Sequence, residues 1–279
     1  NIKNFEMHEL IRFLKKAKNN KSPGPDGIPM EFYKWAKAEF KAEILEIITQ
    51  IWRNKWFLEN MEEANVVTLY KKGNVEDPAN YRPISLLQSI YKIDAELVKN
   101  RLADGIDERI WKLQYGFRAK KSTAQAMFVC RRLQDIVERS DESMTMIFLD
   151  WEKAFDKVYQ DERINAVRRM NIPNEMLQAL ETFYENPRFR IKDMEGKSTW
   201  RRQLTGIRQG CPLSPYLFVI FMTVLFHDVE DEVGRKTMER SMDLVDFSNI
   251  LYADGTILVG KRFIELNKIL GAIDKHSGS

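Results

Sequence analysis

The most informative hydrophobic segment of the chain is a short run, residues 146–149, rich in Ile, Phe and Leu. A run of this length and composition predicts a buried β-strand. The run ends at Asp150, and a carboxylate at the end of a buried strand costs free energy unless it is paired, hydrogen-bonded or bound to a metal. This segment alone leaves two interpretations open: Asp150 binds a metal, or Asp150 caps a helix that begins near Trp151.

Elsewhere, apolar residues recur at helical spacing, and shorter β-branched runs separate the helical segments. The spacing predicts helices over residues 4–18, 30–57, 89–102, 124–138 and 216–229, and a helical pair over 162–186 that breaks near Pro173. The helix over 216–229 is apolar on nearly every side, so we expect it to be buried. The remaining patterns predict hairpins over residues 65–85, 189–204 and 249–260.

The hairpin predicted over residues 65–85 carries three basic residues. We expect its turn at residues 71–74, which include Lys71 and Lys72, and Arg82 follows on the return strand. Cations arranged in this way would converge on one anion, and a triphosphate fits that geometry. The alternative is a hairpin with exposed, solvated charges, and the segment alone does not decide between the two.

The last hairpin, over residues 249–260, has an acidic residue at its turn. Asp254-Gly255 lies between two apolar runs, and Asp-Gly in that setting is the strongest short-range turn signal. We therefore expect Asp254 and Gly255 to form the turn. Whether Asp254 also has a chemical role is left open by this segment alone.

The length of 279 residues allows one large domain or two subdomains with a substantial core. The net charge is only +3, but residues 112–132 hold six basic and no acidic residues, and residues 188–208 hold seven basic and two acidic. Such clusters indicate a surface for a polyanion, and a solvated face is the alternative. The two cysteines and three histidines show no metal-ligand spacing. The longest apolar run, residues 216–226, is too short to span a bilayer.

Six motifs, taken together and in order, resemble those of the reverse transcriptases of non-LTR (LINE-type) retrotransposons. The ordered set covers about residues 22–259, so it is far more specific than any one motif. The motifs are Lys-Ser-Pro-Gly-Pro-Asp-Gly-Ile at 21–28; Leu-Tyr-Lys-Lys-Gly at 69–73 with Asn-Tyr-Arg-Pro-Ile-Ser-Leu-Leu at 80–87; Tyr-Gly-Phe-Arg at 115–118 with Ser-Thr at 122–123; Phe-Leu-Asp-Trp-Glu-Lys-Ala-Phe-Asp at 148–156; Gly-Ile-Arg-Gln-Gly-Cys-Pro-Leu-Ser-Pro at 206–215; and Tyr-Ala-Asp-Gly at 252–255.

The resemblance implies an α+β fold with the fingers and palm of a right-hand polymerase, the palm being a small antiparallel sheet covered by helices. By the same resemblance, residues 1–140 are mainly fingers and N-terminal extension, 141–160 and 205–279 are palm, and 161–204 are a connecting insertion. We expect the thumb to be absent from this chain, and the chain to be a piece of a longer protein that also carries an endonuclease. The family is expected in the nucleus or the cytoplasm.

The resemblance also implies a reaction: template-primed nucleotidyl transfer with an RNA template, a DNA primer, deoxynucleoside triphosphates and two Mg²⁺ ions, for which Mn²⁺ can substitute. Asp150 and Asp254 are expected to be catalytic and to hold the metal ions. Phe155 is expected to exclude a ribose 2′-hydroxyl. The residues expected to bind the nucleotide are Lys72, Arg82, Phe155, Gln209 and Gly210, and those expected to contact nucleic acid are Arg118, Lys120 and Lys121.

One position departs from the family pattern. Gly255 stands where the family normally has a second aspartate after Asp254, so the site lacks one of its three usual carboxylates. Two hypotheses follow: the chain is an RNA-directed DNA polymerase that Gly255 impairs, or it is a catalytically inactive nucleic-acid-binding relic of the same fold. A purely structural helical scaffold is a third, remote alternative.

Overall fold

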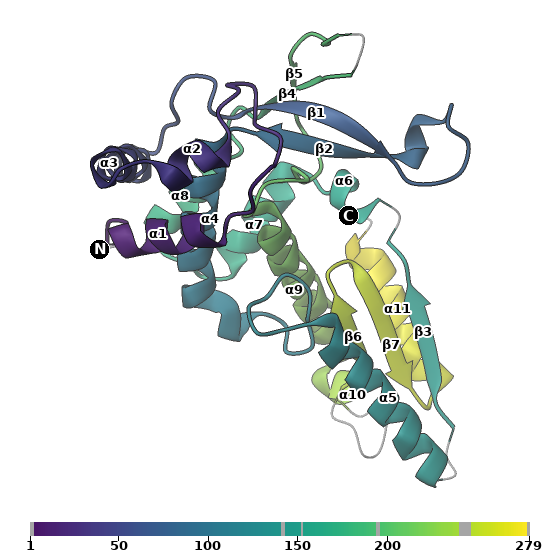
Figure 1. Ribbon diagram of the computed structural model, residues 1–279. Coiled ribbons are helices and arrows are strands. Elements are labelled where there is room, and N and C mark those ends of the chain that lie inside the picture. The colour runs from purple at the N-terminus through teal and green to yellow at the C-terminus, as the bar shows by residue number, and fades with distance from the viewer. Residues whose placement is uncertain (1–2, 141–142, 152, 194–195, 240–246, 278–279) are drawn as a thin grey trace. The chain divides into compact units, whose positions relative to one another are not determined.

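The computed structural model describes residues 3–140, 143–151, 153–193, 196–239 and 247–277. Helices and strands occur throughout the described chain, so it is a mixed α+β protein, as predicted (Figure 1). The chain divides into two compact units: the first comprises Asn1–Gly105, Val158–Ile164 and Asn171–Ser214, and the second comprises Ile106–Lys157, Asn165–Met170 and Pro215–Ser279.

The first unit holds most of the N-terminal helices. The single helix predicted over residues 30–57 is instead two helices, and they separate at Ala36, whose backbone is extended. The ammonium group of Lys41 donates to the Ala36 carbonyl at 2.8 Å, which satisfies a carbonyl that the helix no longer pairs. The helices are α1 (Met7–Lys16), α2 (Met30–Trp35), α3 (Ala38–Asn54), α4 (Ser89–Ile106), α8 (Asn174–Thr182) and the first half of α7 (Gln160–Arg169).

A four-stranded sheet of order β2-β1-β4-β5 belongs to the first unit. The strands β1 and β2 are antiparallel, as are β4 and β5, whereas β1 and β4 run parallel. The turn predicted at residues 71–74 is longer: the strands join across residues 71–80, which include the 3₁₀ turn Pro78–Asn80. The strands are β1 (Glu63–Tyr70), β2 (Tyr81–Leu87), β4 (Arg188–Ile191) and β5 (Arg201–Arg202).

The second unit contains an antiparallel sheet of order β3-β7-β6. Helix α9 is buried along most of its length, as its all-round apolar sequence predicts. A 3₁₀ turn, Asp107–Arg109, follows α4. The elements are α5 (Thr123–Ser140), β3 (Thr145–Leu149), α6 (Ala154–Lys157), the second half of α7, α9 (Ser214–Val233), α10 (Arg235–Glu239), β6 (Asn249–Tyr252), β7 (Gly255–Gly260) and α11 (Phe263–Ser277).

The prediction that β3 is a buried strand is wrong: β3 lies at an edge of its sheet, and its five residues are half-buried or exposed. Helix α5 packs through Leu133 on one end of the sheet face, against Val259 and its cross-strand partner Met146. Phe148 lies on the same face, nearer the β6–β7 turn, and its side chain is 71% exposed. The sequence run alone could not show this, since an apolar strand reads alike at an edge and in the centre.

An acid lies buried in the first unit. Asp94, on α4, is 1% exposed, and neither of its carboxylate oxygens has a hydrogen-bond partner among the described residues. Burial raises the pKa of the Asp94 carboxyl from its ordinary value to about 8, against a smaller opposing effect of the Lys55 ammonium. Desolvation disfavours the charged form, so Asp94 is protonated in the folded protein at neutral pH.

This shift predicts that stability falls as pH rises. The folded pKa lies above the unfolded value near 4, so the folded state holds one more proton between those values. The stabilisation that this extra proton gives is complete below pH about 4 and is lost as pH rises through about 8. Over that range the free energy of unfolding falls by up to about 1.4 kcal/mol per pH unit. Urea unfolding of wild type and Asp94→Asn from pH 5 to 9 measures this slope, which the variant should lack. Asp104→Asn, at an exposed position on α4, should keep the wild-type slope, and a wild-type slope in Asp94→Asn would contradict the assignment.

Candidate active site

The two predicted catalytic acids lie at the same end of the three-stranded sheet. Antiparallel pairing places Leu149 of β3 opposite Thr256 of β7, so Asp150, the next residue, emerges beside the start of β7. The strands β6 and β7 pair from Tyr252 to Gly255, which leaves Ala253 and Asp254 as a two-residue turn at that same end. Asp150 is exposed and Asp254 is half-buried. The register therefore brings together two acids that are 104 positions apart (254 − 150).

The expected turn is shifted by one residue. Ala253 and Asp254 make it, with Ala253 in the left-handed region at φ 58°, and Gly255 is the first residue of β7. The backbone of Gly255 does not need glycine, since its φ is not positive. A Cβ at this position would meet the Tyr252 carbonyl oxygen at 3.4 Å, an ordinary contact. An aspartate therefore fits at 255 without disturbing the hairpin.

Asp150 does not cap the helix that follows it. That helix, α6, begins at Ala154, four residues after Asp150 rather than near Trp151. Trp151 instead ties the end of β3 to β7, because its indole N–H donates to the Thr256 hydroxyl at 3.1 Å. The Thr256 hydroxyl in turn donates to the Asp254 carbonyl at 3.5 Å. These bonds link the residue after Asp150 to the turn that carries Asp254.

A glutamine that the sequence did not single out holds this turn from the other side. Gln114 is fully buried; its side-chain oxygen accepts from the Ala253 N–H at 2.8 Å, and its amide donates to the Ala253 carbonyl at 3.2 Å. The neighbouring Tyr115 N–H donates to the Leu251 carbonyl at 2.8 Å. A Cβ on Gly116 would lie 2.2 Å from the Ala253 nitrogen, so only glycine allows this approach. The Gln-Tyr-Gly sequence contains these residues, but nothing local in it reveals their distant partner.

Phe155, the residue expected to exclude a ribose 2′-hydroxyl, lies on the one-turn helix α6 and is half-buried. Its ring centroid is 4.6 Å from that of Phe218 and 6.2 Å from that of Phe117. The ring is therefore held between Phe218 of α9 and Phe117 of the loop before α5, both in the same unit.

The other expected nucleotide-binding residues lie in the first unit. Lys72 is exposed in the β1–β2 connection, and Arg82 is exposed on β2. The loop with Gln209 and Gly210 packs on the same strand: the Ser85 N–H donates to the Gln209 carbonyl at 2.9 Å. Gly210 has a φ of 137°, and a Cβ there would lie 2.4 Å from the Ser85 carbonyl oxygen. Glycine is thus required for this approach, three residues from Arg82.

Two buried arginines support that loop. Arg163 donates to the Gly206 carbonyl at 2.7 Å and stacks over Tyr184, and Arg208 stacks over Tyr91. Each guanidinium keeps two nitrogen atoms without a hydrogen-bond partner among the described residues. Burial also raises the pKa of Tyr91 well above its ordinary value. The sequence signalled neither arginine as buried, because arginine is rarely found inside a protein.

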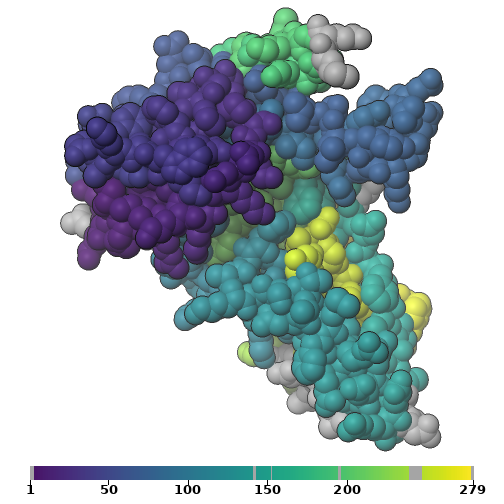
Figure 2. Space-filling view, in the orientation of Figure 1, coloured from purple at the N-terminus to yellow at the C-terminus, as the bar shows by residue number. Residues whose placement is uncertain are grey.

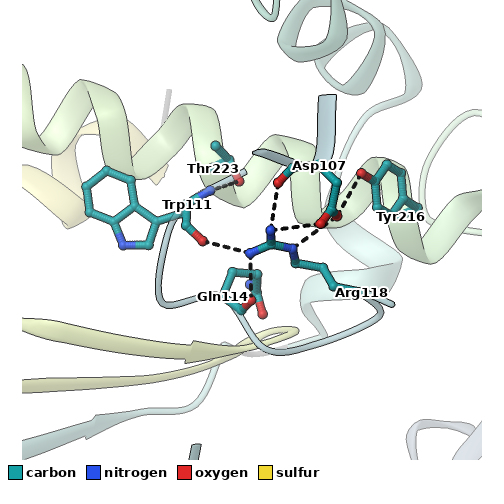
Figure 3. A network of polar contacts seen from close by, with 6 residues as sticks. All are labelled: Asp107, Trp111, Gln114, Arg118, Tyr216 and Thr223. Carbon is teal, nitrogen blue, oxygen red and sulfur yellow. Dashed lines mark hydrogen bonds and ion pairs between the residues drawn. The ribbon is translucent and has the colours of Figure 1, made fainter. Parts of the chain in front are cut away.

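The three basic residues expected to contact nucleic acid differ in their surroundings. Arg118 is 7% exposed by its side chain, and its guanidinium pairs with the Asp107 carboxylate at 2.9 Å (Figure 3). It also donates to the Trp111 and Gln114 carbonyls, so it stabilises the loop that carries Gln114. Lys120 is exposed and Lys121 is half-buried, with the Lys121 ammonium 5.1 Å from the Tyr115 ring centroid. The expectation of a phosphate contact therefore rests on the two lysines.

A family model described as reverse transcriptase (RNA-dependent DNA polymerase) matches residues 70–278 of the chain. The chain belongs to the reverse transcriptase family. The resemblance to the enzymes of non-LTR retrotransposons is confirmed.

Relatives of this reverse transcriptase chain come from mobile elements. It is 31% identical to a probable RNA-directed DNA polymerase from transposon BS of Drosophila melanogaster, over 79% of the chain and 24% of that protein. It is 27% identical to the transposon TX1 uncharacterized 149 kDa protein of Xenopus laevis, over 94% of the chain and 20% of that protein. It is 24% identical to the RNA-directed DNA polymerase from mobile element jockey of Drosophila melanogaster, over 91% and 27%. The chain thus spans about a quarter of these relatives.

A solved structure supports the fold alone. The structure of apo telomerase from Candida tropicalis, truncated from its C-terminal domain, matches with a TM-score of 0.55 and 14% sequence identity. The match covers 78% of this chain and 47% of that chain.

Among the residues described, no helix has the length and apolar character needed to cross a membrane.

Asp150 and Asp254 are this chain's candidate ligands for the divalent metal ions that the reverse transcriptase family uses. Within the described ranges, no group of three or more His, Cys, Asp or Glu residues could hold a metal ion. Two carboxylates, Asp150 and Asp254, nevertheless lie at one end of the sheet, and the structure allows a third at Gly255. Carboxylate oxygens are suitable ligands for Mg²⁺, which retains several waters. The two carboxylates are of the right chemical type for such an ion, but they are one fewer than the three that the family resemblance implies.

The contacts of Gln114 predict that its loss loosens the turn. Gln114→Met keeps the size of the side chain but leaves the Ala253 N–H and carbonyl unpaired in a buried place. We expect the free energy of unfolding to fall by about 1–3 kcal/mol, and the Ala253 amide to exchange faster with solvent. Unfolding curves and residue-resolved hydrogen exchange measure both effects. Gln178→Met, at an exposed position on α8, should change little, and equal behaviour of the two variants would show that Gln114 does not hold the turn.

Proposed function

We propose that this chain is the RNA-directed DNA polymerase domain of a non-LTR retrotransposon, which extends a DNA primer on an RNA template with deoxynucleoside triphosphates. The observation that carries the proposal is the strand register that brings Asp150 to the end of the sheet where the Ala253–Asp254 turn lies. Since the chain spans about a quarter of its relatives, the activity of the whole protein is part of the proposal.

In this proposal Asp150 and Asp254 hold two Mg²⁺ ions, for which Mn²⁺ can substitute. When bound, the ions supply a more nucleophilic primer 3′-oxygen and neutralise charge on the triphosphate. The protein's own part is to fix the two carboxylates. The turn that carries Asp254 is held by Gln114, and the end of β3 is held by the bond from Trp151 to Thr256. Such preorganisation removes the cost of arranging ligands during the reaction.

The remaining roles follow the same resemblance. Lys72 and Arg82 bind the triphosphate. Both side chains are exposed, and Arg82 lies three residues before Ser85, whose N–H donates to the Gln209 carbonyl. Gln209 and the Gly210 backbone line the nucleotide site. Phe155 excludes the ribose 2′-hydroxyl, and its support is the aromatic packing that fixes its ring. Lys120 and Lys121, with Arg118 as their internal support, contact nucleic-acid backbone.

We assign residues 1–140 mainly to the fingers and N-terminal extension, 141–160 and 205–279 to the palm, and 161–204 to a connecting insertion. Support for the palm assignment is that β3, β6 and β7, which carry the acids, form a small antiparallel sheet with α5 packed on one face.

A second candidate function is a catalytically inactive relic that keeps nucleic-acid binding. The observation that favours it is Gly255, because bound Mg²⁺ is the largest charge in such a site and a missing carboxylate weakens its hold. No replacement follows along the chain, since the next residue is Thr256. The two candidates make opposite statements about catalysis and the same statement about binding.

Restoring the missing carboxylate should raise activity. We expect Gly255→Asp to extend a DNA primer on an RNA template about 10- to 100-fold faster than wild type, because a carboxylate near the metal ligands strengthens metal binding. The rate is measured with Mg²⁺ on the protein expressed from its whole reading frame. Gly255→Asn is the matched control, since it has the same shape without the charge, and it should remain as slow as wild type.

The outcomes of this comparison separate the candidates. If wild type extends primers as fast as Gly255→Asp, two carboxylates are enough and Gly255 causes no impairment. If Gly255→Asn is as fast as Gly255→Asp, the charge argument is wrong. If neither wild type nor Gly255→Asp extends a primer while both bind RNA, the relic is correct and the polymerase proposal is wrong.

Shrinking Phe155 should relax the choice of sugar. In an active background, we expect Phe155→Val to raise ribonucleotide incorporation relative to deoxynucleotide incorporation by about tenfold or more, because space opens for a 2′-hydroxyl. Competition between the two nucleotides measures the ratio. Phe117→Val removes the ring contact to Phe155 and serves as the control for lost packing. An unchanged sugar ratio in Phe155→Val would mean that Phe155 is only a packing residue.

A further inference from the structure

The hairpin that contains β4 and β5, residues 188–204, has one strongly basic face. Alternation along β4 and Lys192, the residue directly after it, puts Arg188, Arg190 and Lys192 on the same side. Across the hairpin, the backbone of Arg202 pairs with Arg188, and that of Lys197 pairs with Lys192. Part of the hairpin surface is visible in Figure 2, in green. These five residues, named here the basic face, belong to the first unit.

Both cross-strand pairs on the basic face set a cation directly opposite a cation. Like charges in this position destabilise a hairpin. Glu63 of β1 relieves one of them, pairing with Arg188 at 3.4 Å. In the described part of the hairpin, residues 188–193 and 196–204, the one acid is Asp193, whose carboxylate accepts from the Gly196 N–H at 2.8 Å. The face therefore has a charge arrangement that a bound polyanion would relieve.

An aromatic ring lies among these cations. The guanidinium of Arg190 is 4.3 Å from the ring centroid of Trp200, and that of Arg188 is 5.7 Å away. The Arg190 guanidinium also donates to the Asn65 side chain at 2.8 Å, which fixes its position on the ring. A fixed stack of guanidinium and indole offers flat surfaces on which a nucleobase can continue the stack.

We propose that the basic face and Trp200 form a binding site for single-stranded nucleic acid, in which the cations contact successive phosphates and a base stacks on the Arg190–Trp200 pair. Alternate residues of a strand repeat every 6–7 Å or so, which suits an extended polynucleotide backbone. A duplex would offer phosphates but no free base for the stack. This proposal rests on the proposed polymerase function, to which it adds a binding site for the nucleic acid. Binding at this site requires neither metal ion nor nucleotide.

The test measures binding of fluorescent single-stranded oligonucleotides, RNA in one arm and DNA in the other, by the whole chain in EDTA. We expect Lys192→Glu to bind about tenfold more weakly and to flatten the salt dependence by about 0.7 per lost phosphate contact. The same variant creates an opposite-charge pair with Lys197, so its unfolding midpoint should be equal to or above that of wild type. Weaker binding with undiminished stability is a result that a purely structural role does not give.

Lys268→Glu, at an exposed position on α11, makes the same charge change outside the hairpin and is the matched control. Trp200→Ala should weaken single-strand binding about tenfold and leave binding of a duplex unchanged. The proposal is overturned if Lys192→Glu binds as tightly as Lys268→Glu, or if Trp200→Ala, shown to be folded, binds single strands like wild type. Because no catalysis is measured, a chain that binds but never extends primers defeats the polymerase proposal and leaves this one standing.

Discussion

The pairing of β3 with β7 is the interaction on which the candidate active site depends. Side chains alternate along a strand, so a slip of one residue would turn every side chain of β3 to the other face. Contacts on both sides prevent this slip: Met146 packs with Val259 under α5, and Trp151 bonds to Thr256. Core packing at one end of the sheet thus fixes where Asp150 emerges at the other.

Much of the fold could be predicted because it follows local periodicity. The helical spacing found α4, α5 and α9, and the apolar runs found the β6–β7 hairpin. The errors have one physical origin: a local sequence pattern does not show which distant residues pack against or bond to that segment. An edge strand and a central strand share a composition, and the turn moved by one residue because Gln114 holds Ala253 in the left-handed region. Arg118 looked like a surface cation because its partner, Asp107, precedes the basic cluster in the chain.

Two of the buried charged residues are arginines of the first unit. Arg163 and Arg208 are buried beside the Gly206–Ser214 loop with nitrogen atoms left unpaired among the described residues. Unpaired buried charges cost several kcal/mol (of order 3–5 when a partner is removed), so a helix or loop chosen for stability alone would carry apolar residues there. The stacking of both guanidiniums on tyrosines recovers part of this cost. The bond from Arg163 to the Gly206 carbonyl also holds the start of the loop in which Gly210 approaches Ser85 closely.

Gly255 shows how folding and catalysis make different demands on one position. A glycine inside a strand costs about 0.5–1 kcal/mol relative to alanine, and the backbone at 255 does not need it. A third carboxylate beside Asp150 and Asp254 would instead add like-charge repulsion to the metal-free fold. The same concentration of negative charge that causes this repulsion also attracts a divalent cation. The glycine therefore costs the strand some stability, avoids a repulsion between carboxylates, and leaves the cation site weaker.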